Sequence, residues 1–236
     1  MILLLASELD PRSAILLAAW APHPPVLLTP ADLSAPGWFV EPGHQDHWIL
    51  VASGRRIPAP QVRGILNLLP YVLEQELYNV EKADRRYVAT EMSAFLFFIL
   101  ATIPCPVLNR PTPYAFNGPG WCHEQWSQQC ALLGIPVPPT LRSSAANLIP
   151  PPGAAALRSI QVLGNSLIQD AAQTPPPFHQ QAIALARRAA VDYLKLNFTD
   201  EPNGPSFHSV ELTPNLEDPA TLHAVQAYFT QQEETP

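Results

Sequence analysis

The sequence predicts an α/β protein that begins with an open parallel sheet and ends in a smaller α+β part. Residues 2–7 form a continuous apolar run, typical of a parallel strand covered on both faces, and a helix signal follows it. A second apolar run at residues 24–30 completes a β-α-β beginning. Near the C-terminus, an Asn-Gly turn separates apolar runs at residues 194–198 and 206–212, which predicts a β-hairpin.

The rest of the N-terminal half is expected to extend the parallel sheet. Residues 47–57 predict its third strand, and residues 58–70 predict a loop over the sheet edge because prolines break this stretch. Residues 84–102 predict a buried helix with Asp84 as its N-cap, and residues 105–109 predict the next strand. The expected inward stripe of this helix is Val88, Met92, Phe95, Ile99 and Thr102.

The C-terminal half combines helices with short strands. Its expected elements are helices at residues 121–133, 175–194 and 218–229 and two short strands within residues 157–168. A Pro-rich segment near residues 145–156 is expected to be a linker. We therefore expect two domains, residues 1–113 and residues 114–236.

Composition limits the possible partners. The net charge is −7 and only 14% of residues are charged, well below the quarter that is usual in soluble domains. Binding to nucleic acid depends on Lys and Arg side chains that neutralise phosphates, and the sequence has no strongly basic cluster, so no nucleic-acid partner is expected. A surface with few charges resists association poorly, so we expect a homo-oligomer.

Cysteine usage and the short apolar runs bear on location. Cys105, Cys122 and Cys130 form no Cys-x-x-Cys pair and are odd in number, which favours reduced thiols. The N-terminal apolar run lacks a basic segment before it and predicts a buried strand rather than a signal peptide. The apolar run at residues 94–103 is too short to span a bilayer. We therefore expect a cytoplasmic protein with no membrane partner.

The C-terminal hairpin carries the main candidate site. Its Asn203-Gly204 turn places Asn197 and Glu211 on adjacent strands, where two oxygen ligands could converge on a magnesium ion. An ordinary hairpin with one solvated glutamate is the alternative.

This hairpin resembles the closing element of the ATP-grasp carboxylate–amine ligases, in which an Asp on the first strand and a Glu-x-Asn on the second hold magnesium. Glu211 matches the Glu, whereas Asn197 replaces the Asp and Thr213 replaces the Asn. The N-terminal half is similar to the pre-ATP-grasp domain of this family, especially of its ribosomal-protein glutamylating members. The motifs that carry this similarity follow the family's order: PCPVLNRP at 104–111, GPGWCHEQW at 118–126 and LLGIPVPPTL at 132–141.

Departures from the family pattern imply a degenerate member. The family holds nucleotide phosphates with lysines, but the chain has only Lys82 and Lys195, and neither stands at such a position. The segment at residues 144–157 is too short for the family's nucleotide-clamping subdomain. The resemblance therefore implies an open parallel pre-ATP-grasp sheet followed by a reduced α+β ATP-grasp remnant without that subdomain.

Four cationic side chains are candidates for nucleotide or anion contacts. Arg110 follows a strand end, where open α/β sheets tend to bind ligands, although it could equally pair with a surface Glu. His123 stands where the family has a lysine, although a solvent-facing histidine at a helix start is the favoured interpretation. Arg142 and Arg158 are the other nearby cations in the same chain.

A third segment contains ligand-type residues. His44, Asp46 and His47 lie close together in the sequence and could hold a metal ion. We interpret them instead as part of an exposed polar loop.

These observations predict a non-catalytic ATP-grasp-like protein, a pseudoenzyme without catalytic residues or cofactor, that binds a peptide or a partner enzyme through the inherited cleft. One alternative is a minimal ATP-dependent carboxylate–amine (peptide) ligase that uses Mg-ATP and is completed by oligomerisation. The other alternative is a purely structural assembly subunit.

Overall fold

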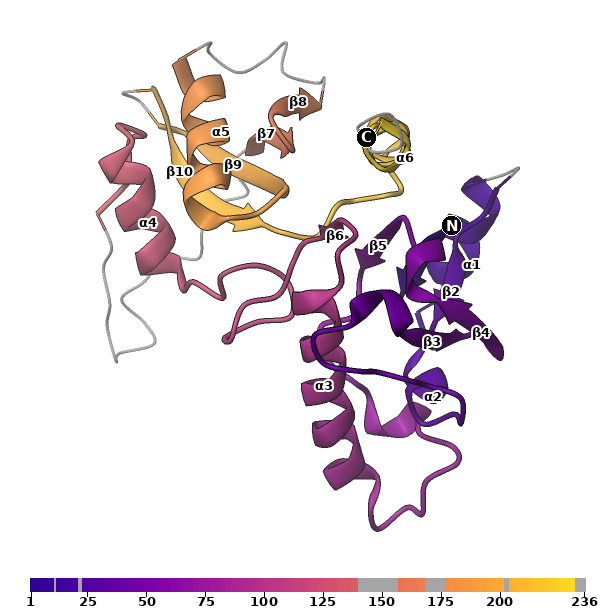
Figure 1. Ribbon diagram of the computed structural model, residues 1–236. Coiled ribbons are helices and arrows are strands. Elements are labelled where there is room, and N and C mark those ends of the chain that lie inside the picture. The colour runs from indigo at the N-terminus through magenta and orange to yellow at the C-terminus, as the bar shows by residue number, and fades with distance from the viewer. Residues whose placement is uncertain (11, 21–22, 140–156, 169–176, 202–203, 232–236) are drawn as a thin grey trace. The chain divides into compact units, whose positions relative to one another are not determined.

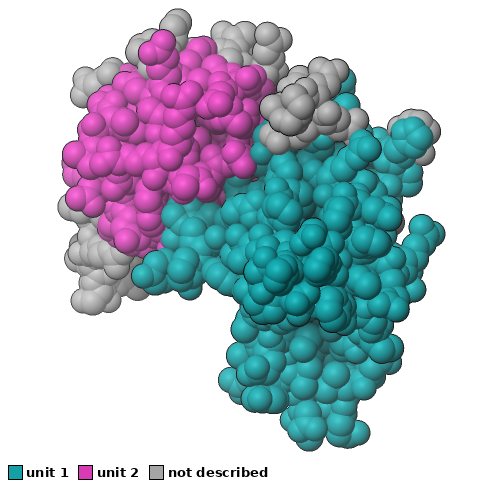
Figure 2. Space-filling model, in the orientation of Figure 1, with its two compact units in different colours: residues 1–119, 216–236 teal, residues 120–215 magenta. Residues whose placement is uncertain are grey.

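The computed structural model describes residues 1–10, 12–20, 23–139, 157–168, 177–201 and 204–231. They form two compact units, the first made of Met1–Pro119 with Leu216–Pro236 and the second of Gly120–Asn215 (Figure 2). The expected division after residue 113 lies close to the first boundary, but the C-terminal helix belongs to the first unit. The linker expected near 145–156, like Arg142, lies outside the described residues.

The first unit contains a four-stranded parallel sheet with the strand order β2-β1-β5-β6 (Figure 1). Its strands are β1 (Ile2–Leu5), β2 (Val26–Leu28), β5 (Gly64–Asn67) and β6 (Val107–Leu108). Helix α1 (Arg12–Ala19) connects the first two strands, so the predicted β-α-β beginning is confirmed. Leu3 pairs with Val26 on one side and with Ile65 on the other, which places β1 inside the sheet.

The third strand of this sheet is not the one expected from the sequence. Residues 47–57 instead contribute β3 (Ile49–Ala52) and much of β4 (Arg55–Pro58), which form a separate antiparallel hairpin. The chain reverses at Ser53 and Gly54, whose φ angles are 50° and 68°. Two consecutive residues with positive φ are typical of a tight hairpin turn, so Ser53 and Gly54 divide residues 47–57 into two antiparallel strands.

β5 supplies the third strand from within residues 58–70, which were expected to be a loop. The prolines that suggested a loop are Pro58, Pro60 and Pro70. All three lie outside the four residues of β5, which are fully buried, so the prolines flank the strand without interrupting its hydrogen bonds.

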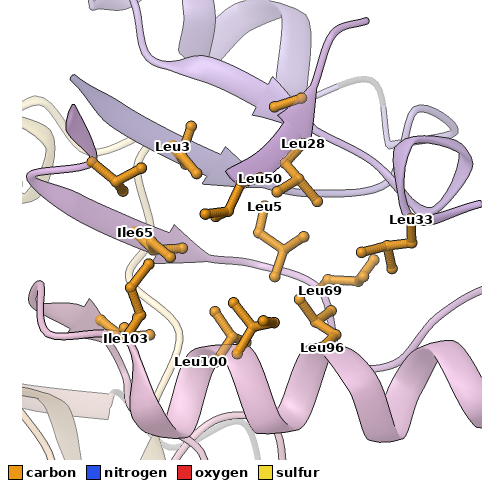
Figure 3. Packing of buried hydrophobic residues seen from close by; sticks show 14 of the residues in the cluster. Leu3, Leu5, Leu28, Leu33, Leu50, Ile65, Leu69, Leu96, Leu100 and Ile103 are labelled. Atoms are coloured by element: carbon orange, nitrogen blue, oxygen red, sulfur yellow. The ribbon is translucent and has the colours of Figure 1, made fainter. Parts of the chain in front are cut away.

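Helix α3 (Arg85–Thr102) packs against the parallel sheet (Figure 3). Leu96 and Leu100 are each 1% exposed and join Leu3 and Ile65 of the sheet in one hydrophobic core. Burying each such side chain contributes roughly 1.5–3 kcal/mol. No helix in the described part of the chain combines the length and apolar character needed to cross a bilayer.

The inward face of α3 includes the first four residues of the expected stripe but not the fifth. Its buried residues are Ala89, Leu96, Ile99 and Leu100. Of the expected stripe, Ile99 is among them and Thr102 is exposed. Val88, Met92 and Phe95 are partly buried and pack against the same core. The second half of the helix is apolar on almost every side, so its sequence pattern does not single out one face. Asp84 does occupy the N-cap position, but its side chain makes no capping hydrogen bond.

Helix α6 (Pro219–Gln231) returns the chain to the first unit. Its Val225 and Phe229 are buried. The Phe229 ring lies against Gly64 of β5, and a Cβ atom at Gly64 would be only 2.3 Å from Cδ1 of the ring. The remaining short helices of this unit are α2 (Pro30–Leu33) and the 3-10 turns η1 (Gln45–His47), η2 (Ala59–Gln61) and η3 (Glu74–Glu76).

The second unit is an antiparallel sheet with the order β10-β9-β7-β8, covered by two helices. Its elements are α4 (His123–Leu132), β7 (Leu157–Leu163), β8 (Ser166–Ile168), α5 (Pro177–Ala189), β9 (Tyr193–Glu201) and β10 (Gly204–Glu211). The predicted C-terminal hairpin is thus confirmed as β9 and β10. α5 ends at Ala189, several residues earlier than expected, because Ala190 turns the chain with a φ of 52°. Together the units form the mixed α/β fold that the sequence predicts.

Candidate functional site

The sheet of the second unit has one apolar and one polar face. Residues paired across antiparallel strands point to the same side, and successive residues alternate. Ile160 therefore shares a face with Leu196, and both lie in a core with residues of α4 and α5. Asn197 pairs with Ser159 and Ser209 and so points to the other side. This second face, called the polar face below, carries Ser159, Gln161, Lys195, Asn197, Thr199, Ser206, Ser209 and Glu211, together with Leu163 and Tyr193 where β7 ends and β9 begins.

Asn197 and Glu211 lie together on the polar face, as the hairpin geometry predicts. The Asn197 side-chain amide donates hydrogen bonds to Oε1 of Glu211 at 2.8 Å and to Oγ of Ser209 at 3.1 Å. Lys195 stands directly opposite Glu211 across the strands, and its Nζ is 3.3 Å from Oε1 of Glu211. The carboxylate therefore has two donors from its own sheet, one of them a cation.

These groups do not fit a magnesium ion. Magnesium is held by oxygen ligands, usually one or two carboxylates together with substrate phosphates. Here Glu211 is neutralised by Lys195, and Asn197 presents an N–H group rather than an oxygen to that carboxylate. Thr213 lies two residues beyond the end of β10 and offers a neutral hydroxyl in place of the family's amide.

Arg110, the strongest predicted anion contact, is engaged with the backbone of its own unit. Its Nη1 donates to the carbonyl oxygens of Leu100, Ala101 and Ile103 at 2.8, 3.3 and 3.1 Å. Its Nη2 donates to the carbonyl of Cys105 at 2.7 Å. The guanidinium thus satisfies the free carbonyls at the end of α3, and an anion would have to compete with them.

The other two predicted anion contacts in the described part of the chain, His123 and Arg158, lie on the side of the sheet that faces away from Glu211. His123 is the first residue of α4, is exposed, and stacks its ring on Phe207 with centroids 5.4 Å apart. Arg158 pairs with Phe198 and so projects from the apolar face of the sheet, opposite to Glu211. The structure therefore does not bring Arg158 together with the candidate magnesium residues.

The sequence reasoning missed three buried polar residues where strands of the parallel sheet end. Such carboxyl ends commonly bind ligands in open α/β sheets. Glu76 is 0% exposed and accepts hydrogen bonds from the Ser7 hydroxyl and, at 2.9 Å, from the Glu8 amide just after β1. Asn67, the last residue of β5, donates to the Phe116 carbonyl at 2.9 Å.

Asn109, which follows β6, is also fully buried, and its backbone N–H donates to Oδ1 of Asn117 at 3.0 Å. The signal that could have found Asn67 and Asn109 is a single polar side chain at the end of an apolar run or directly after it, as in GILN at residues 64–67. Glu76 lies in the polar stretch LEQEL at residues 73–77 and carries no such local signal. The hydrogen bonds of all three residues tie the strand ends to neighbouring segments, so these groups organise the strand ends of the first unit.

Solved ATP-grasp ligases share this fold. Macrocyclase MdnC from Microcystis aeruginosa MRC, bound with precursor peptide MdnA, matches with a TM-score of 0.71 at 13% identity over 99% of each chain. A RiPP-associated ATP-grasp ligase of Chryseobacterium gregarium, in complex with ADP and a leader and core peptide, has a TM-score of 0.61 at 10% identity, covering 100% of this chain and 97% of its own. ATP-grasp ligase PsnB, complexed with precursor peptide PsnA2 and AMPPNP, has a TM-score of 0.61 at 13% identity, covering 99% of this chain and 98% of its own.

The sequence by itself matches no protein-family model and no curated protein. At identities this low the structural likeness establishes the fold alone. The chain has an ATP-grasp-like fold over nearly its whole length, and the resemblance inferred from its motifs is confirmed at this level.

Proposed function

We propose that this protein is a non-catalytic ATP-grasp-like protein that binds a peptide. The peptide part is supported by three structural neighbours, each solved with a precursor, leader or core peptide. The non-catalytic part rests on one observation, the neutralisation of Glu211 by Lys195 and the Asn197 amide on the polar face.

Charge explains why this observation weighs against nucleotide chemistry. Two unit charges 4 Å apart near a protein surface interact by about 4 kcal/mol before salt screening. The Lys195 ammonium, 3.3 Å from Oε1 of Glu211, therefore opposes any further cation at that carboxylate. A magnesium ion would have to displace the ammonium and then would find one carboxylate and no second anionic ligand among these residues.

Calorimetric titration with Mg-ATP tests the non-catalytic part. The wild-type chain should show no binding in the micromolar range. The triple variant Lys195→Ala/Asn197→Asp/Thr213→Asn restores the family's ligand types around Glu211 and should bind Mg²⁺ more tightly than wild type. Micromolar Mg-ATP binding by the wild-type protein that Glu211→Ala abolishes would overturn the proposal.

Peptide binding needs its own experiment. A displayed peptide library is selected on the immobilised full chain, and each enriched peptide is titrated by calorimetry beside a scrambled version with the same composition. The enriched peptide should bind and the scrambled peptide should not. Equal binding of both, or no enrichment, contradicts the peptide part of the proposal and leaves the Mg-ATP result unaffected.

The two alternatives give different outcomes in the same protein preparation. A minimal ligase completed by oligomerisation would release ADP from ATP when an enriched peptide is added. A purely structural subunit would show a defined oligomer by light scattering with no selected peptide. The absence of ADP release together with specific peptide binding is the combination that the proposed function requires.

A further inference from the structure

A second cluster of ligand-type side chains lies in the first unit, in the loop from Glu41 to His47. One nitrogen each of His44 and His47 and a carboxylate oxygen of Asp46 all lie within 4.8 Å of one another. The two imidazole rings are stacked, with centroids 5.4 Å apart and an interplanar angle of 10°. Nε2 of His47 is 3.5 Å from Oδ2 of Asp46. Two nitrogens and one oxygen of the ligand type are therefore gathered close to one another.

Glu41 orients one of these donors. Its Oε2 lies 3.0 Å from Nδ1 of His47, so the ring donates its Nδ1 proton to Glu41 and turns Nε2 toward Asp46. This is the arrangement in which metal-binding histidines occur: one ring nitrogen donates to a carboxylate and the other binds the metal.

The loop is held in this shape by its anchor to the core. Phe39 and Ile49 exchange two backbone hydrogen bonds of 3.0 and 2.8 Å that close the loop. The Trp48 side chain is 0% exposed, and its Nε1 donates to the Glu41 carbonyl at 2.7 Å. Within the loop, the amide of His44 donates to the Glu41 carbonyl and the amide of His47 to the His44 carbonyl. The ligand-type residues therefore stand on a fixed backbone, which favours metal binding.

We propose that His44, Asp46 and His47 form a site for a zinc ion, with Glu41 as a positioning residue and water as the fourth ligand. Zinc accepts imidazole nitrogen and carboxylate oxygen at about 2.0–2.2 Å, so tetrahedral ligand atoms lie about 3.4 Å apart. The present separations exceed this by little more than an ångström at most. The side chains of His47 and Asp46 are 56% and 72% exposed, so small rotations can close that distance. Imidazole donors favour zinc over magnesium or calcium.

Isothermal titration of the full chain with zinc sulfate tests this site. The experiment uses a Cys122→Ser background because Cys122 is an exposed free thiol that could bind zinc independently. His44→Ala and His47→Ala each remove one ligand. His223→Ala is the matched control, since His223 is exposed on α6 outside the loop. Near-UV circular dichroism checks that every variant keeps its packed core.

The background protein should bind one zinc ion per chain with micromolar affinity and bind magnesium far more weakly. His44→Ala and His47→Ala should each weaken zinc binding by at least about tenfold, and His223→Ala should leave it unchanged. Glu41→Ala should weaken it by about 10–100-fold, the usual effect of removing a partner of a metal-bound histidine. Zinc affinity that stays within about twofold of the background in both histidine variants, or zinc binding no tighter than magnesium binding, overturns the proposal.

Discussion

The contact between β5 and the C-terminal helix gives a sharp test of the fold. Replacing Gly64 with alanine adds a Cβ atom 2.3 Å from Cδ1 of Phe229, a ring that is only 1% exposed. Carbon atoms prefer separations of about 3.5–4.0 Å, so the ring or strand must move by about 1.2 Å or more. Overpacking of this kind costs about 1–3 kcal/mol, whereas alanine in a strand is otherwise roughly 0.5–1 kcal/mol better than glycine.

Because the approach is so close, we take the overpacking cost at its upper end of about 3 kcal/mol. The expected net effect of Gly64→Ala is then a loss of about 2 kcal/mol of stability, equivalent to roughly 4–8 °C in Tm for a chain of this size. Urea denaturation followed by circular dichroism measures it. The shorter side chain of Phe229→Leu should relieve the contact, so the double variant should be more stable than the sum of the single effects by at least about 0.5 kcal/mol. A neutral or stabilising Gly64→Ala, or simple additivity in the double variant, would refute the packing of α6 on β5.

Three further predictions concern buried groups. Arg110→Ala should cost about 2–3 kcal/mol in urea denaturation, because it leaves carbonyls at the end of α3 without their charged donor, and a change below about 0.5 kcal/mol would contradict this role. Glu76→Ala should cost a similar amount and Glu76→Gln less, since the amide oxygen still accepts one hydrogen bond; equal losses would argue against the two hydrogen bonds. A thiol reagent should label only Cys122 in the folded protein, because burial raises the pKa of Cys105 to about 11 and of Cys130 to about 12.

The raised pKa values of Cys105 and Cys130 also determine how the stability of the fold changes with pH. A thiol pKa raised from 9.0 means that the folded chain holds these protons more tightly than the unfolded chain does. This contribution to stability is fully present below pH 9 and is lost as the pH rises toward the folded values of about 11 and 12. Cys130→Ala should therefore reduce the loss of stability in urea denaturation above pH 9, and an unchanged slope would contradict it.

Local patterns predicted most elements but not every pairing. β1, β2 and the hairpin of β9 and β10 could be found because apolar runs and turn residues are local signals. The strand β5 was missed because it is only four residues long and prolines stand on both sides of it, at Pro60 and Pro70. Its assignment depends on neighbours distant in the sequence, namely β1 on one side, β6 on the other and the Phe229 ring on Gly64.

The candidate site could be predicted only in part for a similar reason. Hairpin register places Asn197 and Glu211 on one face, and this follows from the sequence alone. The ion pair between Glu211 and Lys195 does not follow from the sequence. β-Sheet alternation shows that Lys195 shares the face, but it does not show that the ammonium reaches the carboxylate. Arg110 was assigned from its place after a strand, but its guanidinium folds back onto α3, a contact that depends on where the helix ends.

The charge of Lys195 is therefore the property of the polar face that most needs an independent test. Lys195→Glu places a second carboxylate directly opposite Glu211, and like charges at opposed positions destabilise a sheet by about 0.2–1 kcal/mol. Magnesium or manganese should bind between the two carboxylates and remove the repulsion. The rise in unfolding midpoint that these ions cause should therefore be much larger for this variant than for the wild type. The matched neutral variant Lys195→Met loses the ammonium without adding a ligand and should respond weakly. If neither Lys195→Glu nor Lys195→Met responds to these ions more than the wild type does, the ammonium is not what keeps a divalent cation from Glu211.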